Sequence, residues 1–206
     1  MTDPRPPRLL LPTPPRAPLE QVVAALPGAL ATGRIACLRL DLPGATEAEV
    51  RRAADALRPL CHEADVPVIL RDHAALAAPL GLDGVQVEAR AHRLRDLRKT
   101  LGPDAVMGVA CGASRHDGMT AAEAGADYVL FGPLAAGSAG AEPVAPEVFE
   151  IWSESIETPV VAEGGLGAAS AGALGAWLDF GAPDAQVWDG DLTAALIALA
   201  DALDAA

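Results

Sequence analysis

The sequence predicts a single (β/α)8 barrel, and three observations support this fold class. The chain has 206 residues, enough for one domain with a sizeable core, and α/β barrels use such lengths as one unit. Hydrophobic residues make up 51% of the chain but aromatic residues only 3%, so the core must consist of Ala, Val, Leu and Ile. Short apolar runs alternate eight times with helical segments, and this alternation is typical of a parallel sheet that eight units close into a barrel.

Each expected strand is a short apolar run that Pro, Gly or charged residues interrupt or bound. In chain order, strands are expected over residues 9–11, 35–41, 66–72, 84–88, 106–111, 128–132, 159–163 and 185–188. The segments between them are rich in Ala and charged residues, which favours helices. Helices are expected over residues 19–30, 47–62, 74–80, 92–101, 117–124 and 146–155, from about residue 170, and over residues 192–203.

The domain organisation is simple. Residues 1–7 contain three prolines and are expected to form a loose leader, and residues 8–206 to form the barrel domain.

The alternative to a closed barrel is an open, doubly wound sheet. Such sheets often carry G-x-G-x-x-G after the first strand; here that motif is missing there, and Gly165-x-Gly167 lacks its third glycine.

Charge and cysteine usage exclude several classes of function. The formal net charge of −13 argues against a nucleic-acid partner, because phosphate backbones need a basic surface. Lys99 is the only lysine and lies in a charged helical segment, which argues against a Schiff-base aldolase. Three unpaired cysteines, with no signal peptide and no apolar run that could span a bilayer, predict a cytoplasmic protein with no membrane partner.

Candidate functional residues lie where the expected strands end, because (β/α)8 barrels carry their chemistry at the carboxyl ends of the strands. The acidic residues among them are also compatible with merely solvated loops. They are Arg39, Asp41, Arg71, Asp72, Gln86, Glu88, Cys111, Gly132, Glu163, Gly164, Gly165, Trp188 and Asp189.

Arg39 is the strongest single candidate. It alternates with Cys37 and Asp41, so all three side chains face the same side of the second strand. A guanidinium that points into a barrel must pair with a carboxylate, Asp41 or Asp72, or hold an anionic ligand. His116, at a helix start after the fifth strand, is either a proton carrier or an inert surface residue.

Gly164 and Gly165 follow the seventh strand directly. The loops after strands seven and eight often hold a phosphate in this fold, and glycine lets backbone amides approach it. The alternative is a tight turn without a ligand. Glu163 places a carboxylate beside this loop, which opposes an anion there.

Taken in order, several segments resemble the thiamine-phosphate synthase (thiamine-phosphate pyrophosphorylase) family and its related thiazole tautomerases, over essentially the whole chain. The segments are residues 38–39, 70–72, 74–77, 81–85, 107–109, 125–133, 159–162 and 164–165. The resemblance implies a (β/α)8 barrel that joins a pyrimidine alcohol diphosphate to a thiazole phosphate and releases pyrophosphate. It also implies Mg2+ and cationic side chains that hold the departing group.

The residues at the strand ends and the resemblance together give a set of expected site residues and partners. We expect a phosphorylated small molecule as substrate, and the sequence leaves a homodimer open. Catalytic roles are expected for Arg39, Arg71 and His116, and Mg2+ at Asp72 if the family chemistry is retained. Substrate and phosphate binding are expected at Gly132, Gly164, Gly165, Gln86 and Trp188.

The chain departs from the family pattern at most of these places. On the second strand, the family has Gln, Glu and Lys at the positions of Cys37, Leu40 and Asp41. On the third and fourth strands, Arg71 replaces an Asn, and the second magnesium carboxylate of the family falls on Ala91. Further along the chain, Ala110 replaces a Ser, residues 136–141 lack the Thr-x-Thr-Lys loop, Glu163 replaces an Ile, and Trp188–Asp189 replace Val–Ser. Cations are lost and acids gained, so weak or absent synthase activity is expected. The alternatives are a tautomerase-like chemistry and a paralogue that binds a ligand without turnover.

Overall fold

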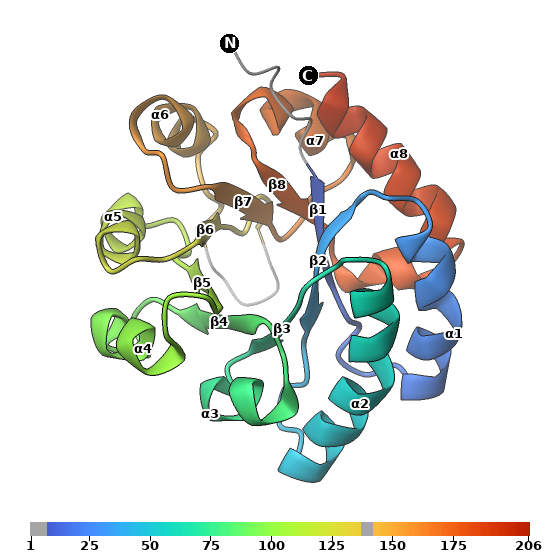
Figure 1. The fold of residues 1–206 in the computed structure, drawn as a ribbon. Coiled ribbons are helices and arrows are strands. Elements are labelled where there is room, and N and C mark those ends of the chain that lie inside the picture. The colour runs from blue at the N-terminus through green and yellow to red at the C-terminus, as the bar shows by residue number, and fades with distance from the viewer. Residues whose placement is uncertain (1–7, 137–141) are drawn as a thin grey trace.

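The computed structural model describes residues 8–136 and 142–206 and confirms the closed barrel (Figure 1). Eight parallel strands pair in chain order, and the last pairs with the first. The strands are β1 (Arg8–Pro12), β2 (Ile35–Leu40), β3 (Val68–Arg71), β4 (Gly84–Glu88), β5 (Val106–Ala110), β6 (Tyr128–Phe131), β7 (Val160–Glu163) and β8 (Phe180–Ala182).

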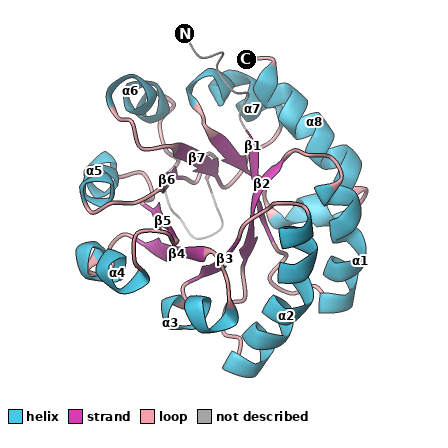
Figure 2. Cartoon of the chain, viewed as in Figure 1, coloured by secondary structure: helices cyan, strands magenta, loops and turns pink. Residues whose placement is uncertain are grey.

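Within the described residues, eight α-helices surround this ring. Figure 2 shows the helices in cyan around the strands in magenta. They are α1 (Leu19–Leu30), α2 (Glu47–Glu63), α3 (Ala74–Ala77), α4 (Leu94–Leu101), α5 (Arg115–Glu123), α6 (Glu147–Ser155), α7 (Ala168–Leu174) and α8 (Leu192–Asp204). Short 3-10 helices lie at Ala78–Leu80, Gly175–Trp177 and Ala185–Asp189. The expected leader, residues 1–7, and most of the expected loop at 136–141 lie outside the described residues.

The hydrophobic core has two layers, and both are built mainly from aliphatic residues, as expected from the composition. The larger layer packs the outer faces of the strands against the helices. The smaller layer fills the barrel interior and includes Ile69, Val161 and Tyr128. Tyr128 fits because its neighbour in register is Gly108, where an added Cβ would lie 2.1 Å from the tyrosine ring.

The predicted eighth strand is wrong. Residues 185–189 form a 3-10 helix, and the strand that closes the ring is Phe180–Ala182. Gly181 of this strand must be small, since a Cβ there would lie 2.6 Å from Leu166. The apolar pair Val187–Trp188 favoured the wrong segment, because small residues carry no strand signal of their own.

Aspartates at the amino-terminal ends of the strands account for part of the acidic composition. Just before β4, β6 and β8, a carboxylate accepts a hydrogen bond from the first or second amide of the preceding strand. The pairs are Asp83 with Val68 (2.7 Å), Asp127 with Met107 (2.7 Å) and Asp179 with Val160 (2.9 Å). These carboxylates link neighbouring strands at the end of the barrel opposite to the expected site.

The buried cysteines make the stability sensitive to alkaline pH. Burial raises the pKa of the Cys61 and Cys111 thiols to about 12, from an ordinary value of 9.0. Between pH 9 and 12 the folded protein therefore keeps both thiols protonated, whereas the unfolded chain ionises them. The contribution of these thiols to the free energy of unfolding is complete below pH 9 and is lost as the pH rises from 9 to 12. We expect a fall of up to about 1.4 kcal/mol per pH unit for each thiol, measured by urea unfolding. A Cys61→Ala, Cys111→Ala variant with the same slope would contradict this.

Across the described residues, no helix combines the length and the apolar character needed to cross a bilayer.

Candidate active site

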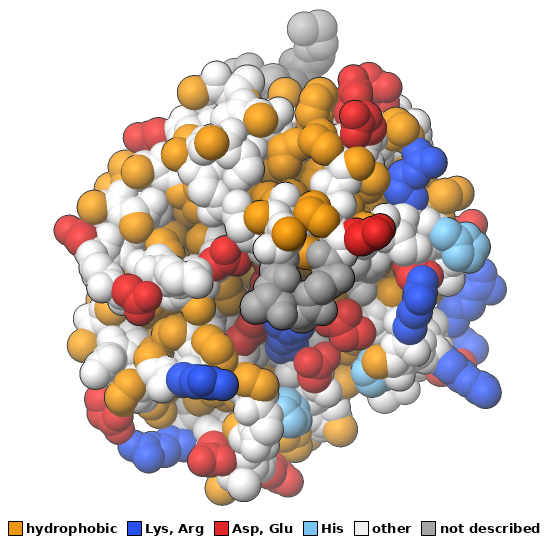
Figure 3. Space-filling model, turned by 180° about the vertical axis from the view of Figure 1, so that it is seen from behind, with side chains coloured by type: hydrophobic (Ala, Val, Ile, Leu, Met, Phe, Trp, Pro, Cys, Tyr) orange, Lys and Arg blue, Asp and Glu red, His pale blue; other side chains and the backbone are white. Residues whose placement is uncertain are grey.

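The carboxyl ends of the strands form one face of the barrel, seen in Figure 3 from the side opposite to Figure 1. Acidic and basic side chains lie side by side near the middle of this face. Most of them belong to one connected group, which we call the mouth network. Its members are Arg39, Asp41, Arg71, Asp72, Gln86, Glu88 and Glu163.

Arg39 lies at the centre of the mouth network, and its side chain is 0% exposed. Its Nε and Nη2 donate to the two carboxylate oxygens of Asp41 at 2.6 and 2.9 Å. Its Nη1 donates to Gln86 Oε1 and to Glu163 Oε2, both at 3.0 Å, and its Nη2 also donates to Glu163 Oε1. A guanidinium has five N–H donors. All five are therefore used within the chain, and none is left for a phosphate.

The expectation that Arg39 is buried against a carboxylate is thus confirmed for Asp41, whereas Asp72 is not its partner. Burial by itself would lower the pKa of Arg39. The hydrogen bonds and charges of Glu163 and Asp41 outweigh it and raise that pKa, so the guanidinium stays charged.

Gln86 connects Arg39 to the barrel interior and is only 1% exposed. Its Oε1 accepts from Arg39 and, at 2.8 Å, from the hydroxyl of Tyr128. Because arginine can only donate, this pair fixes the orientation of the amide. Burial raises the pKa of Tyr128, which keeps its phenol a neutral donor. Sequence reasoning missed Tyr128, although it is the only tyrosine in the chain and pairs in register with a glycine.

Arg71 is the more accessible cation of the mouth network, with 36% of its side chain exposed. Its Nη1 lies 3.3 Å from Asp41, its Nη2 3.2 Å from Glu88, and its Nε 3.5 Å from Asp72. Burial alone would lower the pKa of Arg71, but the charge of Asp41 is the main opposing effect and the net shift is upward. The mouth network holds two guanidinium groups and four carboxylates, a formal charge of −2.

The glycines at the strand ends lie close to residues of the neighbouring strand or loop. A Cβ on Gly132 would lie 2.2 Å from the carbonyl oxygen of Glu163. Gly164 and Gly165 have φ angles of 83° and 94°, which favour glycine. The amide of Gly165 donates to Asp184 Oδ2 at 2.9 Å, an interaction that sequence reasoning did not anticipate.

Two predicted site residues lie apart from the mouth network. His116 is exposed in the first turn of α5, and within the described ranges its side chain makes no hydrogen bond or ion pair. Trp188 lies in a 3-10 helix, and its indole nitrogen donates to the carbonyl oxygen of Pro12 at 2.9 Å. The structure therefore gives Trp188 a bracing contact between the last loop and β1.

Comparisons with known proteins agree with the fold and show the family of the chain. Residues 9–178 match the family model described as "Thiamine monophosphate synthase". The chain belongs to the thiamine-phosphate synthase family. It is 40% identical to the thiamine-phosphate synthase of Rhodospirillum centenum, over 88% of this chain and 89% of that one. It is 37% identical to that of Erythrobacter litoralis, over 86% and 87% of the two chains.

A solved structure supports the same architecture. The thiamine phosphate pyrophosphorylase from Pyrococcus furiosus superposes with a TM-score of 0.81 at 22% identity, covering 95% of each chain. At that identity the likeness shows the fold alone. Membership of the thiamine-phosphate synthase family places the chain in thiamine biosynthesis.

The residues present do not fit the Mg2+ that the thiamine-phosphate synthase family implies. Asp72, the carboxylate expected to hold the ion, lies against the guanidinium of Arg71, which opposes a cation there. Ala91, at the position expected for the second carboxylate, offers no oxygen ligand on its side chain. In the part of the chain that the structure describes, no group of three or more His, Cys, Asp or Glu side chains is arranged to hold a metal.

Proposed function

We propose that this member of the family binds a thiamine precursor at the barrel mouth but does not run the synthase reaction at a useful rate. The observation that carries the proposal is the complete use of the five Arg39 donors by Asp41, Glu163 and Gln86. Arg39 is the one residue of the family's second-strand signature that this chain retains, and here its guanidinium binds Asp41 and Glu163 of the same chain.

The charge of the mouth supports the same conclusion. Release of pyrophosphate requires cations or hydrogen-bond donors where negative charge develops, and losing one donor typically costs about 10²–10³ in rate. Two like charges about 4 Å apart repel by roughly 4 kcal/mol at an effective dielectric constant near 20. A diphosphate placed between Glu88 and Glu163 would meet such repulsion with only Arg71 still partly accessible.

The test is a pyrophosphate-release assay with both precursors and Mg2+. We expect no multiple turnover above background from this protein, while the Rhodospirillum centenum relative provides the positive control under the same conditions. Thermal-shift titrations with each precursor alone measure binding independently of turnover. Steady multiple turnover by the unmodified chain would contradict the proposal, and so would the absence of any precursor-dependent shift.

Synthase turnover itself is the second candidate function, because of the 40% identity to a named synthase over most of the chain. If turnover is observed, Arg71 is the cation that must meet the diphosphate, and Arg71→Met should reduce kcat/KM by at least about tenfold. The tautomerase-like alternative needs a proton carrier at the mouth. We do not favour it, because His116 makes no contact with the mouth network in the described structure.

A further inference from the structure

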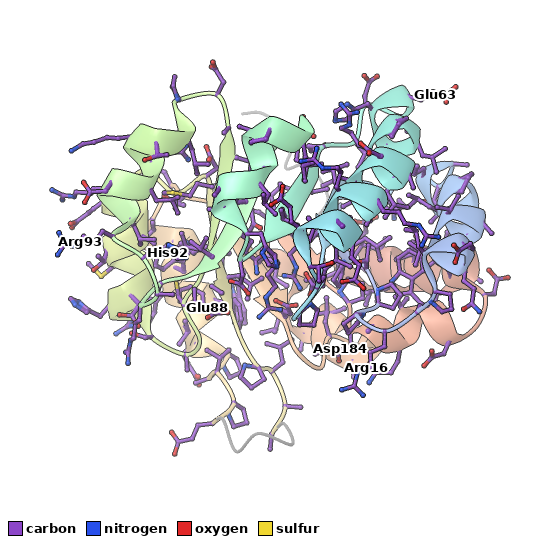
Figure 4. All side chains as sticks on the ribbon, turned by 90° about the horizontal axis from the view of Figure 1, so that it is seen from below. Arg16, Glu63, Glu88, His92, Arg93 and Asp184 are labelled. Carbon is purple, nitrogen blue, oxygen red and sulfur yellow. The ribbon has the colours of Figure 1, made fainter. Side chains whose placement is uncertain are left out.

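One amide of the loop after β7 already holds an anionic group. The Gly165 N–H donates to Asp184 Oδ2 at 2.9 Å. Asp184 follows β8 by two residues and immediately precedes the 3-10 helix Ala185–Asp189. It lies on the same side of the barrel as Glu88, far from Glu63 at the end of α2 (Figure 4). Loops after strands seven and eight are the usual place for a phosphate in this fold, so the carboxylate stands where a phosphoryl oxygen is expected.

The surrounding contacts hold this loop in place. The Gly164 carbonyl accepts from the Leu134 amide at 2.6 Å, which ties the β7 loop to the β6 loop. The Gly167 amide donates to Ser170 Oγ at 2.9 Å, and Ser170 Oγ in turn donates to the Gly165 carbonyl at 3.2 Å. The backbone around Gly165 is thus fixed by its neighbours on both sides, and its amide faces the β8 loop.

Asp184 has no cationic partner that would explain its position. Within residues 8–136 and 142–206 it forms no ion pair with an arginine or lysine, and Arg16, on the same side in Figure 4, makes none with it. Its carboxylate is held by a backbone N–H, and such charge-assisted bonds are stronger than neutral ones. A phosphate monoester at Gly165 must displace this carboxylate or lie against its charge.

We infer that Asp184 is a specificity-determining residue that makes the mouth prefer the alcohol form of a ligand over its phosphate monoester. Its carboxylate accepts the hydrogen bond of the Gly165 amide that a phosphoryl oxygen would otherwise accept, and its negative charge repels a phosphate monoester. This inference rests on the proposed function, because it names the chemical form of the precursor that the mouth accepts.

The test compares the affinities of the thiazole alcohol and the thiazole phosphate by isothermal calorimetry. In the unmodified protein the alcohol is expected to bind at least as tightly as the phosphate. Asp184→Asn keeps an oxygen that can accept from the Gly165 amide and removes the charge. We expect it to raise the affinity for the phosphate relative to the alcohol by at least tenfold. Asp179→Asn is the matched control, because Asp179 accepts a β7 amide at the same 2.9 Å at the opposite end of the barrel.

The ratio of the two affinities decides the inference. An unchanged ratio in Asp184→Asn, an equal change in Asp179→Asn, tighter phosphate binding by the unmodified protein, or no binding of either probe would each overturn it. The amide resonance of Gly165 gives a second measurement: inorganic phosphate should leave it unmoved in the unmodified protein and shift it in Asp184→Asn. Failure of this inference is distinguishable from failure of the proposed function, because an unchanged ratio can occur while a precursor still binds and no pyrophosphate is released.

Discussion

Replacing Arg39 by methionine is expected to lower the free energy of unfolding by about 3 kcal/mol. The change leaves the carboxylates of Asp41 and Glu163 without their shared cation. Removing one partner of a buried pair typically costs about 3–5 kcal/mol. We expect the lower end of this range, because the side chains of Asp41 and Glu163 keep 13% and 21% exposure and can recover some hydration.

Urea unfolding measures this loss of stability. Two further variants show how much of it comes from the unpaired charges. Arg95→Met is the control, since Arg95 is 74% exposed and only 4.0 Å from its acid partner, and it should change stability by less than about 0.5 kcal/mol. A variant that combines Arg39→Met with Asp41→Asn and Glu163→Gln should recover part of the loss, because no unpaired charge remains. A loss below about 1 kcal/mol for Arg39→Met alone would show that the mouth network contributes little to folding.

Gly132→Ala is expected to cost about 3 kcal/mol, or to prevent folding, although it adds a single methyl group. The new Cβ would lie 2.2 Å from the Glu163 carbonyl oxygen, so β6 and β7 would have to separate where β7 carries Glu163 of the mouth network. Gly167→Ala is the matched control, because a Cβ added there would have no atom within 4 Å and the φ of −120° suits any residue. Thermal unfolding of the two variants side by side gives the comparison, and equal midpoints would contradict the steric argument.

Local patterns predicted most of the fold because local physics controls it. The helix at 19–30 and the strand at 84–88 have the predicted bounds, since apolar periodicity and bounding glycines and prolines determine where they begin and end. The alternation of period two along β2 likewise predicted the contact between Arg39 and Asp41, which are two residues apart. No long-range information was needed for either.

The missed features all depend on contacts between distant parts of the chain. Glu163 was interpreted as a residue that repels phosphate, but it reaches across the barrel to Arg39, 124 residues earlier. The short strand β8 is specified by its neighbours rather than by its own residues, since Gly181 is there to make room for Leu166. Asp184 meets the Gly165 amide only once that strand has its true position, so a strand placed five residues late hid this contact.

The closure of the ring between β1 and β8 bears on how the chain reaches its folded state. Leu9 pairs with Gly181, so the first strand made during synthesis receives its second neighbour only when nearly all of the barrel has been translated. Until then β1 presents a row of free peptide groups, and an open edge of this kind can pair with another chain. Because such distant pairings slow folding, nascent barrels that stall before β8 emerges are the species in which aggregation should begin.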